Sequence, residues 1–207
     1  MFLTPMRLLE ATGLVTGLQT CALPIWLVCV WLLIRQNVWT WPLGIVYVLV
    51  SIVIFLDARL YADLLLHLGF LGLNAYGWFF WLRGGSTSRA ALPVTRAGAA
   101  PVAALVLAAG IGTGVFGRVF ELRTDADLPY WDNATTCLSL AAMWLSTRKH
   151  LENWVLWFVV DVLATGIYLY KGLYFYALLY LVYTGMAVAG WRAWRRSLAA
   201  EQALAPA

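Results

Sequence analysis

The sequence predicts an all-α polytopic membrane protein with seven transmembrane helices. Of its 207 residues, 63% are hydrophobic and only 12% are charged, whereas a soluble domain carries roughly 25% charged residues. So few charges cannot cover a water-soluble globule, which excludes an ordinary soluble enzyme, a nucleic-acid-binding domain and a disordered chain. The net charge of +4 is therefore better explained by membrane topology than by a basic binding face.

Seven apolar runs account for the predicted helices. Most are close to the ~20 residues that a helix needs to cross the hydrocarbon core, and the fifth and sixth are short. They are apolar on all sides, which excludes the alternating pattern of a transmembrane β-barrel. All are free of charge except the sixth, which contains Asp161. The runs are 14–34, 36–56, 64–82, 97–117, 133–147, 153–170 and 172–191.

Basic residues divide unequally between the two sides of the predicted bundle. With seven spans, the loops after the first, third and fifth helices share a side with the C-terminus. Nine Lys or Arg residues lie on that side and five on the other. The positive-inside rule therefore predicts a cytoplasmic C-terminus and an N-terminus outside. The nine are Arg35, Arg83, Arg89, Arg96, Arg148, Lys149, Arg192, Arg195 and Arg196.

An internal repeat divides the chain. Residues 31–83 align without a gap onto 144–196, and 18 of the 53 pairs are identical. The matches include several Trp, Gly and Arg pairs, such as Trp41 with Trp154 and Gly77 with Gly190. The sequence therefore predicts a 3+1+3 arrangement within a single membrane domain. Its parts are a first three-helix repeat over 14–83, a linker helix over 97–117 and a second repeat over 131–196.

The two repeats are offset by four helices, so both copies cross the membrane in the same direction. Parallel repeats of this kind occur in secondary transporters, including the sugar-transporting SWEET fold, and the substrate binds near the midplane at the repeat interface. An old duplication without transport function is the simpler alternative. The linker helix is rich in Ala and Gly and is interpreted as structural, and the loop 83–97 as a flexible cytoplasmic connector.

Asp161 is the clearest candidate for function. An ionisable residue midway along a transmembrane helix costs about 2.5–3.5 kcal/mol on insertion scales and is a functional candidate by default. The alternative is a structural hydrogen bond or a protonated carboxyl. No Lys or Arg lies at the same depth in another predicted helix, so a cationic substrate is a plausible counter-charge.

Aromatic residues share the helix face of Asp161. Trp154, Trp157, Thr165 and Tyr168 are spaced from it and from one another by three and four residues, which places them in one stripe. Such a stripe can stack a flat ring and attract a cation. The chain has 31 Trp, Tyr and Phe residues, so any one of them can instead be an interfacial anchor or core residue.

Several further polar or aromatic residues are candidates for substrate binding. Asp132, Thr135, Thr136 and Ser139 follow one face of the fifth helix, where hydroxyls can bind a sugar or equally bond to carbonyls of their own helix. Asn74 can contact a polar group of the substrate or hold two helices together. Trp41, the repeat partner of Trp154, is also a candidate. No metal site, nucleophile–base pair or cofactor motif is present, so we expect neither cofactor nor catalysis.

Longer motifs resemble the bacterial nicotinamide riboside transporter family, PnuC. They are IRQNVWTWPLGI (34–45), FLDARLYAD (55–63), YGWFFWLRGG (76–85), LPYWDNATT (128–136), RKHLENWVLWFVVDV (148–162) and YKGLYFYALLYL (170–181). The resemblance covers about 26–196.

The resemblance implies a homotrimer of seven-helix facilitators in the bacterial inner membrane, surrounded by lipid. It also implies inward passage of nicotinamide riboside, a flat pyridinium cation, in support of NAD biosynthesis. The family's W-x-x-W-x-x-x-[ND] pattern corresponds to Trp154, Trp157 and Asp161. Thiamine or riboflavin transport and proton coupling are alternatives, because relatives in the wider family carry those vitamins and Asp161 can carry a proton.

One segment departs from the family. TGLQTCALPI (16–25) resembles a translated sequencing-adapter fragment, and Pro24 is expected to break the first helix. On this interpretation Cys21 and Pro24 have no function.

Overall fold

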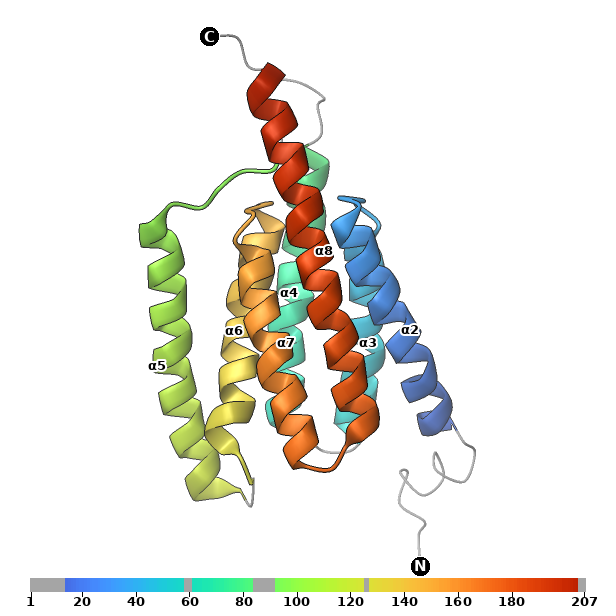
Figure 1. Cartoon of the computed structure of the whole chain (residues 1–207). Helices are drawn as coiled ribbons and strands as arrows, with labels where there is room; N and C mark the ends of the chain where they lie inside the picture. Colours follow the sequence, from blue (N-terminus) through green and yellow to red (C-terminus); the bar gives the residue numbers. More distant parts are fainter. Residues whose placement is uncertain (1–13, 58–60, 84–91, 125–126, 205–207) are drawn as a thin grey trace, which may run out of the picture. The chain divides into compact units, whose positions relative to one another are not determined.

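The computed structural model describes residues 14–57, 61–83, 92–124 and 127–204, and within them it contains seven helices and no strand. Figure 1 labels these helices and colours them along the sequence, from blue to red. They are α2 (Leu14–Ile34), α3 (Thr40–Asp57), α4 (Tyr61–Arg83), α5 (Ala99–Arg123), α6 (Pro129–Thr147), α7 (Asn153–Tyr170) and α8 (Tyr174–Leu204). The all-helical prediction is confirmed, and each helix covers most of one predicted apolar run.

Three of the described helices are long and apolar enough to span a membrane. These are Ala99–Arg123, Asn153–Tyr170 and Tyr174–Ala203, and shorter apolar helices cover Pro24–Ile34 and Thr40–Val53. The count of seven spans therefore stays a prediction. α5 and α8 both extend beyond the predicted ends of their runs, because their last turns carry polar residues that a search for uncharged runs leaves out.

The expected break at Pro24 is wrong. α2 runs from Leu14 to Ile34 with Pro24 inside it. A proline removes one helical hydrogen bond. In an apolar environment no water competes for the other backbone groups, so they remain bonded within the helix and the helix continues past the proline. The side chain of Cys21 lies outside the described residues.

The chain divides into two compact units, Met1–Thr87 and Ser88–Ala207, and each is described by itself. In the first unit α2 packs on α3 and α3 packs on α4. In the second unit α5, α6, α7 and α8 pack on one another in chain order.

Two helices end in the same unusual way. The amides of Gln36 and Asn37 donate to carbonyls at the end of α2, and those of Lys149 and His150 do so at the end of α6. Both are Schellman motifs, which need a left-handed residue that is most often glycine. Here that residue is Gln36 (φ 54°) in the first unit and Lys149 (φ 52°) in the second.

The cores of the two units also contain matching aromatic contacts. Trp41 meets Trp81 edge-on with ring centroids 5.3 Å apart, and Trp154 meets Trp194 edge-on at 5.4 Å. In each unit a glycine lies directly against the first tryptophan, because a Cβ added at Gly77 would meet Trp41 and one at Gly190 would meet Trp154. The paired positions are all 113 residues apart, which is the offset of the sequence repeat.

Candidate functional site

Asp161 lies in the middle of α7 and is buried. Only 6% of its surface is exposed. Within the part of the chain that the structure describes, its carboxylate has neither a hydrogen bond nor an ion pair. The nearby Thr165 hydroxyl donates to the backbone carbonyl of Asp161 at 2.7 Å and leaves the carboxylate untouched. A buried carboxylate without a counter-charge is costly, so it can gain most from a ligand that brings a positive charge.

Trp157 lies one turn before Asp161 on the same face of α7. Its indole is half-buried and packs against a small core cluster formed by Ala141, Ala142, Leu145 and Leu156. Its Nε1–H donates to the Oγ of Ser146 on α6 at 3.3 Å. Part of the ring remains exposed, and we interpret this part as available to a flat ligand.

Trp154 is enclosed by its own unit. It is 2% exposed, meets Trp194 edge-on and lies against Gly190. Its indole N–H is buried and has no hydrogen-bond partner among the described residues. These contacts give Trp154 a clear packing role, while its predicted contact with substrate stays a prediction.

Tyr168 lies near the end of α7 within a group of tyrosines from α8. Its ring stacks on Tyr176 with centroids 5.4 Å apart and lies 5.2 Å from Tyr180 at an angle of 30°. The half-buried Tyr168 therefore belongs to an aromatic surface that two helices build together. The stripe predicted on α7 continues onto α8.

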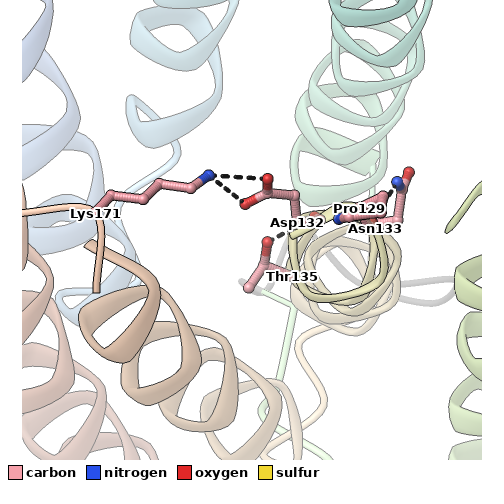
Figure 2. A network of polar contacts seen from close by, with 5 residues as sticks. All are labelled: Pro129, Asp132, Asn133, Thr135 and Lys171. Carbon is pink, nitrogen blue, oxygen red and sulfur yellow. Dashed lines mark hydrogen bonds and ion pairs between the residues drawn. The ribbon is translucent and has the colours of Figure 1, made fainter. Parts of the chain in front are cut away.

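The polar face of α6 is mostly engaged in local bonds. Thr135 donates to the carbonyl of Asp132 at 2.8 Å, and Ser139 donates to that of Thr135 at 2.7 Å. Asp132 forms an ion pair with Lys171, 2.9 Å from its Oδ2, and Figure 2 shows this bridge beside Thr135. Thr136 is half-buried. Of the two alternatives for these hydroxyls, the structure supports bonding to the helix backbone for Thr135 and Ser139.

Asn74 and Trp41 lie in the first unit. Asn74 is 2% exposed, its amide nitrogen donates to the Phe70 carbonyl at 2.9 Å, and its amide oxygen lies against Gly44. This contact links α4 to α3, as expected for an amide that joins two helices. Trp41 is packed against Trp81 and Gly77 in the same way as Trp154 in the second unit.

Sequence reasoning missed a short segment, residues 92–97, that we call the strap. The strap was expected to belong to a flexible connector, and this is wrong. The amide of Thr95 donates to the Lys149 carbonyl, and the Leu151 amide donates back to the Thr95 carbonyl. Residues 84–91 of the predicted connector lie outside the described residues.

Side-chain hydrogen bonds also hold the strap in place. The Lys149 amine donates to the Leu92 carbonyl at 2.8 Å, and Glu152 accepts a hydrogen bond from the Ala97 amide at 2.8 Å. Val94 is almost completely buried. The sequence of this loop offered no sign of these contacts, because the partners are more than 50 residues away in the chain.

We expect Lys149 to make stability depend on pH. Burial lowers the pKa of Lys149 to about 8, below the value of about 10.4 in an unfolded chain. Below pH ~8 the folded protein carries the full cost of the buried charge, and stability rises between pH ~8 and ~10.4 as that charge is lost. Raising the pH from about 7 to about 9.5 should therefore increase the melting temperature of the wild type more than that of Lys149→Met. Equal changes in both proteins would contradict this assignment.

Comparison with known proteins identifies the family. The nicotinamide mononucleotide transporter family matches residues 16–196. The chain is 31% identical to the nicotinamide riboside transporter PnuC of Escherichia coli, across 91% of this chain and 85% of that protein. It is 28% identical to the riboflavin/roseoflavin transporter RibM of Streptomyces davaonensis, across 89% and 83%.

A solved structure has the same fold. The crystal structure of the vitamin B3 transporter PnuC superimposes with a TM-score of 0.70 at 19% identity, across 94% of this chain and 87% of that one. The family match includes all of residues 16–25, so it extends through the segment that departs from the quoted motifs. The chain therefore belongs to the nicotinamide mononucleotide transporter family, which consists of membrane transporters and not of enzymes.

Proposed function

We propose that this protein carries nicotinamide riboside into the cell by facilitated diffusion, in support of NAD biosynthesis. The observation that carries the proposal is Asp161, a carboxylate that is 6% exposed and has no partner in the described part of the chain. Nicotinamide riboside has a pyridinium ring with a permanent positive charge. Binding would place that charge near the carboxylate, where the low dielectric strengthens their attraction.

The aromatic residues around Asp161 support the same substrate. Trp157 and Tyr168 lie on the helix face of Asp161, one and two turns away, and both are half-buried. A flat cationic ring can stack on such side chains and gain a cation–π attraction. Thr136, Ser139 and Asp132 on α6, together with Asn74, Trp41 and Trp154, remain proposed contacts for the rest of the substrate.

We also propose the 3+1+3 arrangement in the bacterial inner membrane, with α5 as the linker. The matching Schellman motifs and Trp–Trp–Gly contacts at an offset of 113 residues support a duplicated three-helix unit. The unequal distribution of Lys and Arg supports a cytoplasmic C-terminus and an outer N-terminus.

A homotrimer in lipid is the assembly that the resemblance implies. The surface of α5 is consistent with it, because only Ala109 and Gly117 of this helix are buried. A largely apolar helix with so little covered surface needs lipid or a neighbouring subunit against it. Native mass spectrometry of the detergent-solubilised protein tests the trimer, and a monomer that still transports would contradict it.

Binding and uptake measurements test the proposed substrate. We expect the purified protein to bind nicotinamide riboside at least tenfold more tightly than nicotinamide, thiamine or riboflavin, because only the riboside combines the pyridinium charge with the ribose. Uptake by reconstituted vesicles should be unchanged by a proton uncoupler. Loss of uptake on uncoupling would instead show proton coupling.

Riboflavin is the second candidate substrate, since RibM is among the relatives. Its isoalloxazine ring is flat but uncharged, so it needs the aromatic surface and not the carboxylate. Tighter binding of riboflavin than of nicotinamide riboside, with no loss in Asp161→Asn, would support this candidate and overturn the first.

A further inference from the structure

We propose that Ser146 is a positioning residue that holds the ring of Trp157 in the orientation needed to bind the substrate. The inference rests on the proposed function, because it assigns Trp157 as a surface on which the flat ring of the substrate stacks. Ser146 does not touch the substrate in this proposal. It acts through the indole N–H of Trp157.

The hydrogen bonds of Ser146 have a definite direction. Its Oγ donates its hydrogen to the carbonyl of Ala142 at 2.9 Å, which leaves the lone pairs of Oγ to accept. The indole of Trp157 has one donor and no acceptor, and its Nε1 lies 3.3 Å from Oγ. These two hydrogen bonds join α6 to α7 through the Ser146 hydroxyl.

Ser146 itself cannot easily move. It is 0% exposed, as is Ala142, and the neighbouring Leu145 is 1% exposed. Close packing of this kind holds side chains in single rotamers. The acceptor is therefore at a fixed place on α6, while Trp157 is half-buried and retains exposed surface. Fixing the ring before the ligand arrives removes part of the ordering cost of binding.

Trp41 and Trp154, which occupy equivalent positions near the starts of α3 and α7, are held differently. Trp41 and Trp154 have buried indole N–H groups for which the described part of the chain supplies no acceptor. Packing against Trp81 and Trp194 therefore determines their orientation. That arrangement occurs in both units, so it does not distinguish the unit that contains Asp161.

The Ser146–Trp157 bond belongs to the second unit alone. At the equivalent positions of the first repeat the chain has Leu33 and Gly44, which can form no such bond. The pair thus accompanies Asp161, whose equivalent is Val48. A polar pair that is confined to the unit with the buried carboxylate is expected to serve the site and not the shared scaffold.

A double-mutant cycle tests the proposal. The proteins are wild type, Ser146→Ala, Trp157→Phe and the double variant, and the measurement is the Kd for nicotinamide riboside in detergent. Phenylalanine keeps an aromatic ring but has no N–H to position. We expect Ser146→Ala to weaken binding about five- to tenfold in the wild type, the size of one neutral hydrogen bond, and not to weaken it in Trp157→Phe.

One further variant completes the test. Ser146→Thr keeps the hydroxyl and should restore most of the affinity, which a simple loss of packing would not do. An equal loss from Ser146→Ala in both backgrounds would overturn the proposal, because Ser146 would then act independently of the indole N–H. Thermal unfolding of each variant checks that the differences in Kd do not come from unfolded protein.

The proposed substrate and the role of Ser146 can fail separately. If the wild type binds riboflavin or thiamine and not nicotinamide riboside, the proposed function is overturned, and the same cycle is run with the vitamin that binds. If Trp157→Ala leaves the affinity for the bound compound unchanged, the role of Ser146 is overturned while the substrate assignment stands.

Discussion

Replacing Asp161 with asparagine is expected to lower uptake of nicotinamide riboside at least tenfold. The carboxylate is 6% exposed, and asparagine keeps its shape while removing its charge. In a site of low dielectric, the loss of one opposite charge costs well over the ~1.4 kcal/mol that corresponds to a factor of ten. The measurement is initial uptake into vesicles together with the Kd of the purified protein, and Asp161→Ala should give at least the same loss.

The matched control is Asp127→Asn. Asp127 is an exposed aspartate of the same unit, so its replacement removes the same charge away from the proposed site and should leave uptake unchanged. Removing a charge from the interior should also leave folding intact or improve it. Wild-type uptake by Asp161→Asn would remove Asp161 from the site and with it the main support for a cationic substrate.

Replacing Gly190 with alanine is expected to destabilise the second unit markedly. A Cβ at this position would meet three ring carbons of Trp154 at 2.5 Å, and the ring is confined by Trp194 on another side. Overpacking costs about 1–3 kcal/mol, and three close ring carbons of a confined tryptophan place this site in the upper part of that range, above the ~1 kcal/mol that alanine gains over glycine in a helix. Thermal unfolding of the detergent-solubilised protein should show a melting temperature lower by several degrees.

The same helix offers the control. A Cβ at Gly185 would meet nothing within 4 Å, so Gly185→Ala should leave stability unchanged or raise it. The first unit offers the parallel pair, since Gly77 lies against Trp41 and Gly72 has open space. We expect Gly77→Ala to destabilise and Gly72→Ala not to. A neutral Gly190→Ala would show that Trp154 can move aside, and a neutral Gly77→Ala would weaken the case for equivalent units.

Much of the fold could be predicted because its causes are local. Charge-free runs mark the helices, since a chain in lipid must satisfy its backbone within each segment. The place of Asp161 midway along a helix was also predictable, because it is the one charged residue of its run, whereas its low exposure of 6% depends on the neighbouring helices. The actual ends of α5 and α8 were not, since polar residues continue a helix once it has left the apolar region.

The contacts around the candidate site could not be predicted in the same way. The spacing along α7 places Trp154, Trp157 and Asp161 on one face, but it treats both tryptophans alike. The structure separates them, because Gly190 and Trp194 of α8 enclose Trp154, while Ser146 of α6 binds Trp157 and leaves it half-buried. The hydroxyls of α6 were open to two interpretations until Thr135 and Ser139 were seen to bond to their own helix.

The sequence by itself determined the class of protein, its helices, its repeat and the one acid that lies within a predicted span, Asp161. These follow from composition and from periodicity along one helix, which need no knowledge of the neighbouring helices. Only the tertiary structure decided which face of each side chain is covered, where the strap is bound and which tryptophan is held by a hydrogen bond. Those properties depend on residues of other helices, brought into contact by packing that no local pattern in the chain specifies.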